Sequence, residues 1–393
     1  MKTVSISVFL LVLSTQLGAQ SEKPILVFDL EAETVDSITN IGYDENLTSG
    51  TTNFFVGNYF PEIEQLELSL PTEEVYPGSQ YTLKQKVSDF YDVENYPNRT
   101  TIKLFQEIDG ELISHCSGSM ISRRHVLTAT HCLANSPSNE LFVERLFASP
   151  AFDNGSFPWL PGSYVKKIYF FRDWDIASED FAILELEEPI GDEVGWISIG
   201  FDEDDDALES HTFYKFSYPN ASVPWDSNEY NGDTLYFSYG AISEASELHI
   251  IIEGSNGIPG ESGSSIIHVE NEETYTSYGT LTFATNQRHS RFRNYHFHAF
   301  EQIIEDDLEV SINPVTAEAE EVILYPNPTN GRLSIECPSI ITSLKVLDLT
   351  GRLIRELDPK ANQINLSDLP VGTYVLQIET EDLVVNKKII LRD

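Results

Sequence analysis

Three short segments carry a histidine, an aspartate and a serine, in that order along the chain. His131 lies in the segment Thr-Ala-Thr-His-Cys, Asp180 begins Asp-Phe-Ala-Ile-Leu-Glu-Leu, and Ser262 lies in Gly-Glu-Ser-Gly-Ser. An imidazole, a carboxylate and a hydroxyl can act as base, orienting group and nucleophile, which is the chemistry of a serine hydrolase. One such motif alone is weak evidence for a catalytic site, because glycines flank serines in many turns. The ordered set predicts a catalytic triad.

Each of the three residues also has a plain structural alternative. The neutral imidazole of His131 could accept the proton of Ser262, or it could simply pack beside Cys132. Asp180 precedes an apolar strand, where a buried carboxylate needs hydrogen-bond partners such as His131. Its alternative is a strand-end aspartate that faces water.

The serine segment predicts an anion-binding loop as well as a nucleophile. Glycines beside Ser262 allow positive φ and a close approach of the backbone to a substrate carbonyl. The amides of Gly260 and Ser262 would then form an oxyanion hole. The alternative is an ordinary Gly/Ser turn.

The elements that must position these groups are strands. From about residue 87 to 310, short apolar runs alternate with turns, a pattern that predicts an all-β barrel or sandwich. Residues 102–113 indicate a hairpin around Asp109-Gly110, and residues 297–308 indicate a helix. Further strands are predicted at 125–128, 165–171, 181–184, 235–239, 248–252 and 265–269.

The flanking segments differ in character. Residues 20–86 are acidic and carry no chemical motif, which fits a pro-segment or a small β domain. Residues 310–321 have the composition of a linker. Residues 322–393 contain a dense turn cluster and closely spaced alternating strands, which predict a small C-terminal β-sandwich.

Composition and the N-terminus bear on location and partners. The 393-residue chain carries 63 Asp and Glu against 24 Lys and Arg, a formal net charge of -39, so we expect no nucleic-acid partner. Residues 1–19 combine Lys2, a short apolar run and small residues, which predicts a signal peptide. We expect no transmembrane segment, because no other apolar stretch is long enough.

Export permits disulfides, and the chain has three cysteines. Cys116 and Cys132 bracket the histidine segment. A bridge between them would join two strands to that loop and stabilise the fold by roughly 3 kcal/mol. Cys337 is left over, as a buried small apolar residue or as a reactive thiol.

The region from about residue 90 to 308 resembles the trypsin-like serine peptidases of the chymotrypsin fold. Its three segments are similar to that family's Thr-Ala-Ala-His-Cys, Asp-Ile-Ala-Leu-Leu and Gly-Asp-Ser-Gly-Gly. The Gly-x-Ser-Gly-Ser form, with Ser-Tyr-Pro upstream, is more like the bacterial branch that includes glutamyl endopeptidases. The resemblance implies a double antiparallel β-barrel with a C-terminal helix over residues 87–309, and a Cys116–Cys132 disulfide. It implies hydrolysis of protein or peptide substrates through an acyl-enzyme, with no metal and no cofactor.

Two departures from the family pattern concern Glu261 and Ser265, which stand where aspartate and proline are usual. In many animal members the aspartate pairs with a new N-terminus after processing. Cleavage between Lys86 and Val87 could by analogy free Val87 to pair with Glu261. The alternative is that no such pair is needed, as in much of the bacterial branch.

Substrate specificity leaves further alternatives open. The resemblance implies a pocket with Asn256 at its base and Thr282, Phe283 and Ala284 on its wall. A basic cluster over residues 288–298 could favour acidic substrate side chains, or it could balance acidic loops. The acidic run 202–206 could bind Ca²⁺ or form a solvated loop, which is the more common role of such runs.

The tail resembles the C-terminal sorting domains of type IX secretion substrates. Tyr-Pro-Asn-Pro near residue 325, Gly-Thr-Tyr near 374 and a terminal Lys-Lys-Ile-Ile carry this resemblance. It implies type IX secretion machinery as a partner, passage through the periplasm of a Gram-negative bacterium, and a final place outside the cell or on its outer surface. The alternative is an adhesive or carbohydrate-binding sandwich.

The sequence thus predicts a secreted serine endopeptidase. Two other functions remain open at this point: a catalytically silent trypsin-like binding module, and an esterase that uses the same three side chains.

Overall fold

A computed structural model describes residues 24–39, 48–51, 75–224, 229–270 and 274–310 of the main body. In the tail it describes residues 323–325, 329–337, 340–347, 353–360, 363–370, 372–380 and 384–392. The predicted signal peptide lies outside the described residues.

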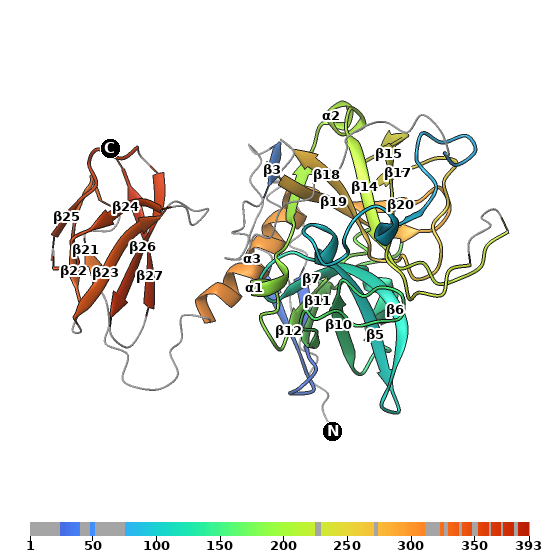
Figure 1. The fold of residues 1–393 in the computed structure, drawn as a ribbon, viewed down its shortest axis with the longest axis horizontal. Coiled ribbons are helices and arrows are strands. Elements are labelled where there is room, and N and C mark those ends of the chain that lie inside the picture. Colours follow the sequence, from blue (N-terminus) through green and yellow to red (C-terminus); the bar gives the residue numbers. More distant parts are fainter. Residues whose placement is uncertain are drawn as a thin grey trace, which may run out of the picture.

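The first sheet contains eight strands, six of which close into a barrel. Its order is β10-β5-β6-β7-β12-β11-β1-β2, and an additional pairing of β10 with β11 closes the ring. All of its pairs run antiparallel. The barrel strands are β5 (Thr101–Ile108), β6 (Glu111–Met120), β7 (His125–Thr128), β10 (Leu146–Pro150), β11 (Ser163–Phe171) and β12 (Ala182–Leu186) (Figure 1).

Local chemistry explains the start of this barrel. The turn between β5 and β6 is Asp109-Gly110, and both residues have positive φ, 53° and 84°. That backbone suits a two-residue hairpin, and Asp-Gly adopts it readily. The predicted hairpin is therefore confirmed. Every residue of β12 is buried, since the barrel core lies on one side of it and other elements cover the second side.

The second sheet has ten strands. Its main order is β16-β17-β20-β19-β18-β14-β15-β4; off this path, β13 pairs with β19, and β3 pairs with β13. Among the described residues no strand pair closes this sheet, so it is a half-barrel rather than the second closed barrel that the family resemblance implied. Eight of its ten strands are β13 (Ser198–Asp202), β14 (Thr212–Ser217), β15 (Tyr236–Ala241), β16 (Glu244–Ala245), β17 (His249–Ile251), β18 (Ser265–Glu270), β19 (Thr274–Phe283) and β20 (Arg288–Arg291).

The N-terminal segment contributes strands to both sheets. The hairpin of β1 (Pro24–Asp29) and β2 (Thr34–Thr39) extends the first sheet through β11. β3 (Ser49–Thr51) pairs with β13, and β4 (Gln85–Lys86) pairs with β15. The described parts of residues 20–86 therefore do not form a separate β domain.

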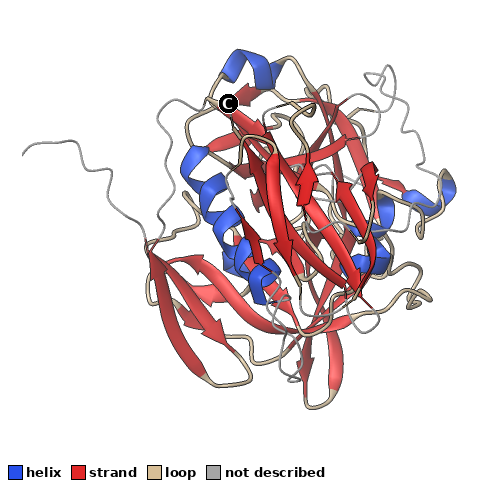
Figure 2. Cartoon of the chain, turned by 90° about the vertical axis from the view of Figure 1, so that its left-hand side faces the viewer, coloured by secondary structure: helices blue, strands red, loops and turns tan. Residues whose placement is uncertain are grey.

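One long helix, α3 (Asn294–Val310), follows the second sheet and covers the predicted helix 297–308. Figure 2 shows it as the longest helix, beside the strands. Its Phe297 ring lies 5.1 Å from that of Phe201 in β13, and Phe300 and Ile303 are buried in the same core. The short elements are α1 (Gly191–Val194), α2 (Asp205–Glu209), β8 (Ala134–Asn135), β9 (Glu140–Leu141) and the 3-10 turns η1 (Val87–Asp89), η2 (Asn98–Thr100) and η3 (Thr130–Cys132).

The tail folds as two antiparallel sheets around one apolar core. The three-stranded sheet has the order β21-β22-β25 and the four-stranded sheet the order β24-β23-β26-β27. Both sheets contribute to the core, through Leu333 and Ile364 on one side and Val346 and Leu376 on the other. Cys337 packs against this core, half-buried, and forms no disulfide. The strands are β21 (Ile323–Tyr325), β22 (Arg332–Glu336), β23 (Ile341–Leu347), β24 (Leu353–Leu357), β25 (Gln363–Asn365), β26 (Gly372–Thr380) and β27 (Val384–Leu391).

The predicted fold class is confirmed in its main features: an all-β body with a C-terminal helix, followed by a small β unit. Within the described residues, none of the helices is long and apolar enough to cross a membrane.

Candidate active site

The three predicted residues come from three loops at the ends of strands. His131 lies in η3, directly after β7, and Asp180 lies just before β12. Since Ala182 of β12 pairs with Thr128 of β7, the two loops leave the barrel at the same end. Ser262 lies between β17 and β18, in the half-barrel.

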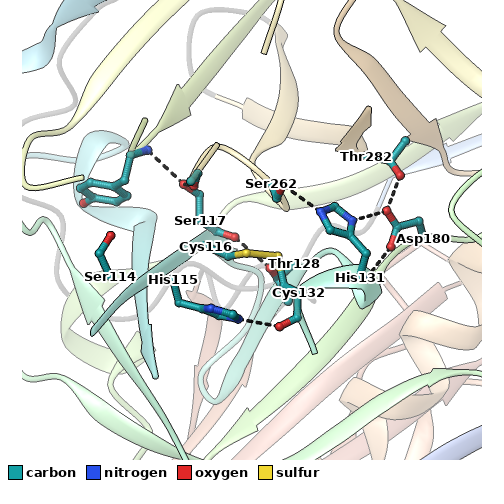
Figure 3. The surroundings of a disulfide bond; sticks show 12 residues. Ser114, His115, Cys116, Ser117, Thr128, His131, Cys132, Asp180, Ser262 and Thr282 are labelled. Atoms are coloured by element: carbon teal, nitrogen blue, oxygen red, sulfur yellow. Dashed lines mark hydrogen bonds and ion pairs between the residues drawn. A yellow bond between two sulfur atoms is a disulfide. The ribbon is translucent and has the colours of Figure 1, made fainter. Parts of the chain in front are cut away.

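The structure brings these three side chains into one hydrogen-bonded row, drawn in Figure 3. The Nδ1 atom of His131 lies 2.6 Å from Oδ2 of Asp180, and its Nε2 atom lies 2.8 Å from Oγ of Ser262. The Asp180 side chain is fully buried, whereas 23% of the His131 side chain is exposed and Ser262 is half-buried. His131 and Ser262 are therefore partly exposed to solvent, whereas the Asp180 carboxylate is shielded from water.

The buried carboxylate of Asp180 has further hydrogen-bond donors. The backbone N–H of His131 donates to Oδ1 at 2.8 Å, and the Thr282 hydroxyl donates to Oδ2. A charge taken out of water is costly unless it is paired or hydrogen-bonded, and these donors meet that need. Thr282 was expected on a pocket wall, and its contact with Asp180 was not foreseen from the sequence.

The residues on either side of Asp180 tie its loop to α3. Glu179 accepts a hydrogen bond from the Tyr295 hydroxyl at 2.7 Å. The Phe181 ring is buried and meets the rings of His296 and Phe300 edge-on, at centroid distances of 4.6 and 5.3 Å. The start of α3 thus holds the loop in place from the half-barrel side.

The serine loop needs glycine at two positions. Gly260 has φ of +91°, and a Cβ there would lie 2.4 Å from the Tyr218 carbonyl oxygen. Gly263 has φ of +80°, and a Cβ there would lie 2.2 Å from Oγ1 of Thr128. Both conformations are open to glycine and strained for other residues.

Strand β6 anchors the same loop. The N–H of Ser117 donates to the Ser262 carbonyl at 3.0 Å, and its hydroxyl donates to the Gly260 carbonyl at 2.8 Å. Figure 3 shows Ser117 between the serine loop and the disulfide. These contacts join the nucleophile candidate to the barrel that carries His131.

Two amides of the loop are left available. The N–H groups of Glu261, Gly263 and Ser264 donate to backbone carbonyls. Within the part of the chain that the structure describes, the N–H groups of Gly260 and Ser262 donate to no acceptor. These are the two groups predicted for the oxyanion hole: one belongs to Ser262 itself, and the other belongs to Gly260, two residues before it.

A disulfide joins Cys116 of β6 to Cys132 of η3, with Cα atoms 6.4 Å apart. It links the strand that anchors the serine loop to the turn that carries His131. Beside it, the Cys132 carbonyl lies 2.5 Å from Nε2 of His115, and burial lowers the pKa of that imidazole.

The other residues predicted for the specificity pocket are Asn256, Phe283 and Ala284. The side-chain oxygen of Asn256, a half-buried residue, accepts the N–H of Asn286 at 3.1 Å. Phe283 is half-buried and Ala284 is exposed, whereas Thr282 turns to Asp180.

The basic cluster after β19 is largely occupied by acidic partners. Arg291 is buried and pairs with Asp205, and Arg293 pairs with Glu203. Asp204, in the same acidic run, caps α2 by accepting the N–H groups of Asp206 and Ala207. These pairings favour the interpretation that the arginines balance acidic loops. Within the described residues, no group of three or more His, Cys, Asp and Glu is arranged to hold a metal ion.

Glu261, directly before Ser262, is a fully buried ionised group. Burial by itself raises the pKa of this carboxyl, but Lys215 and Lys84 nearby outweigh burial and lower it to about 2. Burial lowers the pKa of Lys215 to about 8, against the opposing effect of Glu261.

Comparisons with known proteins identify the family of this chain. A sequence model described as Trypsin matches residues 95–294, which is just over half of the chain. The chain therefore belongs to the trypsin family of serine peptidases. A second model, described as the secretion system C-terminal sorting domain, matches residues 323–392 and implies delivery by a secretion system.

Among curated relatives, the glutamyl endopeptidase of Bacillus licheniformis is 25% identical over 248 residues, which is 61% of this chain and 72% of that protein. Serine protease 23 of Bos taurus and that of Homo sapiens are each 28% identical, over 24% of this chain. The match spans only 29% and 28%, respectively, of those two proteins.

Solved structures give weaker likenesses. A Glu endopeptidase in complex with MPD aligns with a TM-score of 0.45 and 16% identity, over 57% of this chain and 96% of the other. The protease Anisep from Arthrobacter nicotinovorans aligns with a TM-score of 0.41 and 19% identity, over 56% of this chain and 100% of the other.

Proposed function

We propose that this chain is a secreted serine endopeptidase in which Ser262 is the nucleophile, His131 the general base and acid, and Asp180 the group that orients His131. The observation that carries the proposal is the pair of hydrogen bonds that joins one imidazole to a buried carboxylate and to a half-buried hydroxyl. Membership of the trypsin family supports the same reaction class.

The reaction follows from these contacts. As Oγ of Ser262 attacks the peptide carbonyl, Nε2 of His131 takes its proton, and the carbonyl oxygen becomes an oxyanion. The N–H groups of Gly260 and Ser262 stabilise that charge. His131 then gives the proton to the leaving amine, and the acyl group stays on Ser262. A water, deprotonated by His131, attacks the acyl-enzyme; the bond between the acyl carbon and Oγ of Ser262 breaks, His131 returns the proton to Oγ, and the acid is released.

Asp180 contributes through His131. Its carboxylate accepts the Nδ1–H of the imidazole, which fixes the tautomer with a free Nε2 lone pair toward Ser262 and stabilises the imidazolium that forms. Because Asp180 also accepts from Thr282 and from the His131 backbone, it keeps this orientation throughout.

The domain arrangement we propose follows the order of export. Residues 1–19 are a signal peptide, residues 87–309 the peptidase domain, 310–321 a linker and 322–393 the sorting domain. The match of residues 323–392 supports this last assignment. We infer passage through the periplasm of a Gram-negative bacterium, export by type IX secretion machinery, and release or surface attachment.

Replacing the nucleophile tests the reaction. Ser262→Ala is compared with Ser138→Ala, an exposed serine outside the site, on a mixed peptide pool and with a fluorophosphonate probe. We expect Ser262→Ala to lose roughly 10⁶ in turnover and all labelling, while Ser138→Ala keeps both.

Three results would contradict the proposal. Peptide cleavage that persists in Ser262→Ala places the nucleophile elsewhere. A wild-type protein that neither cleaves peptides nor reacts with the fluorophosphonate probe is a silent binding module. A wild type that cleaves esters but no peptide is an esterase.

A further inference from the structure

The carboxylate of Glu261 is held by four donors in the interior. Its Oε1 atom accepts from the Ser217 hydroxyl at 2.7 Å and lies 3.1 Å from Nζ of Lys215. Its Oε2 atom accepts from the N–H of Ile258 at 2.6 Å and lies 3.4 Å from Nζ of Lys84. The Glu261 and Lys215 side chains have no exposed surface, and 1% of the Lys84 side chain is exposed.

This cluster shapes the backbone that would bind the oxyanion. Ile258 and Glu261 close a tight turn from both ends, since the Glu261 N–H donates to the Ile258 carbonyl and the Glu261 carboxylate accepts the Ile258 N–H. Gly260 lies inside that turn and Ser262 follows it, so the direction of both available amides depends on where the carboxylate sits. A buried carboxylate that loses its cations is strongly destabilised, and the turn that it closes is destabilised with it.

Lys84 belongs to the segment before the expected processing site at Lys86–Val87. Besides Glu261, its ammonium donates to the Tyr76 hydroxyl at 2.6 Å and to the Asn256 carbonyl at 3.2 Å. Tyr76 and Tyr81, which precede it in the same segment, are buried.

The segment is also fixed to the half-barrel by its backbone. Thr82 donates to the Tyr239 carbonyl, and β4 pairs with β15. Val87 itself is buried, and its N–H donates to the Leu235 carbonyl at 3.0 Å. In the uncleaved chain Glu261 therefore already has its cations, and Val87 already has another partner.

We propose that Lys84 and Lys215 are positioning residues that hold Glu261, and through it the Gly260 and Ser262 amides, so that the site is assembled without cleavage at Lys86–Val87. Residues 75–86 then belong permanently to the catalytic domain, and removing them inactivates the enzyme. This inference rests on the proposed function of Ser262.

Substitution of the lysines tests the positioning role. Lys84→Met and Lys215→Met are compared with Lys86→Met, a matched control because Lys86 is exposed and two residues from Lys84. We expect kcat to fall roughly 10- to 100-fold in the first two, approaching the loss of an oxyanion-hole donor, with little change in KM. Lys84→Arg keeps the charge and should recover much of the loss, and Lys86→Met should match wild type. A wild-type kcat in Lys84→Met overturns the proposal.

A second measurement does not require the variants to fold. The active secreted protein is labelled with a fluorophosphonate, and its intact mass and N-terminal sequence are determined. We expect every labelled form to contain residues 75–86. A labelled, active form that begins at Val87 and lacks the preceding segment overturns the proposal. Ser262→Ala, labelled in parallel, separates the two proposals. A wild type that is not labelled contradicts the proposed function. A wild type that is labelled, together with a Lys84→Met variant that keeps the wild-type kcat, contradicts only the role of Lys84.

Discussion

At the scale of single residues, Asp180 shows how much of a site lies outside its motif. The segment Asp-Phe-Ala-Ile-Leu identified the carboxylate, but one of its donors is the hydroxyl of Thr282, 102 residues later. Glu261 shows the same pattern, because Lys84 and Lys215 reach it from distant segments. In both cases a charge that is identifiable in the sequence is stabilised by partners that only folding brings near.

Thr282→Val should lower kcat without unfolding the protein. Valine keeps the shape but removes the hydroxyl that donates to Asp180, so the carboxylate loses one of its donors and holds His131 less firmly. We expect a fall in kcat of roughly tenfold, comparable to other lost hydrogen bonds to a charged group. Steady-state kinetics check this, with the exposed Thr34→Val as control. An unchanged kcat would show that the Thr282 contact is dispensable.

Glu261→Gln should change the acid stability in a defined direction. The folded pKa of Glu261 is about 2, below its ordinary 4.5, so the folded state favours the ionised form. Its contribution to stability is present above pH 4.5 and is lost as the pH falls from 4.5 toward 2. Denaturant unfolding at several pH values should show a stability gap between wild type and Glu261→Gln that narrows over this range. A gap that is constant with pH contradicts the assignment.

At the scale of elements, the N-terminal hairpin extends the sheet of the barrel beyond its closed ring. Ile25 of β1 is 1% exposed and joins the main core, and the Phe28 ring stacks on Phe170 of β11 at 5.1 Å. The opposite strand, β2, is almost entirely exposed. β1 therefore pairs with β11 and contributes to two cores, through Ile25 on one face of the strand and Phe28 on the other, while β2 stays exposed.

Two substitutions on this hairpin should differ sharply in their effect on the free energy of unfolding. Ile25→Ala removes buried methyl groups and leaves a cavity, so we expect a loss of about 2–5 kcal/mol in the free energy of unfolding. Val35→Ala, at a position 61% exposed on β2, should change it by less than about 0.5 kcal/mol. Denaturant unfolding compares the two, and equal effects would show that β1 adds nothing to the barrel.

The disulfide is a second element-scale constraint. Removing it in the double variant Cys116→Ala, Cys132→Ala frees the η3 turn from β6. We expect the free energy of unfolding of the catalytic part to fall by about 3 kcal/mol, and kcat to fall because His131 lies beside Cys132. Cys337→Ala, which alters the free cysteine of the tail, is the control. A double variant as stable as this control would contradict the expectation.

At the scale of the whole molecule, the body buries histidines in their neutral form. Burial lowers the pKa of His125 to about 4 and, with Lys215, that of His289 to about 3. Both residues are fully buried, one in each sheet. The unfolded chain binds protons at these sites near pH 6.5, whereas the folded chain does so only at much lower pH.

Stability should therefore begin to fall at mildly acidic pH. Between pH 6.5 and about 4 the unfolded state holds more protons on His125 than the folded state, so the free energy of unfolding decreases as the pH falls. His125→Gln removes this titration, and its unfolding free energy should decline less steeply than that of wild type over the same range. Identical slopes would show that His125 is accessible to protons in the folded state.

Much of the fold could be predicted because its signals are local. Alternating apolar residues, the Asp109-Gly110 turn and the apolar spacing of 297–308 each depend on near neighbours, and the structure contains the corresponding hairpin and helix. The place of residues 24–39 could not be predicted. The place of an edge strand depends on the sheet that it joins, and the residues of β1 carry no local signal that identifies β11 as their partner.

The sequence by itself determined which chemical groups this protein has, in which order, and which family it resembles, because motifs of a few residues encode local backbone shape and side-chain type. Only the tertiary structure decided that Thr282 turns to Asp180 and that Lys84, from a segment that looked removable, meets Glu261 in the interior. Such contacts join residues about a hundred or more positions apart, and their energy depends on burial and distance, which exist only once the chain is folded.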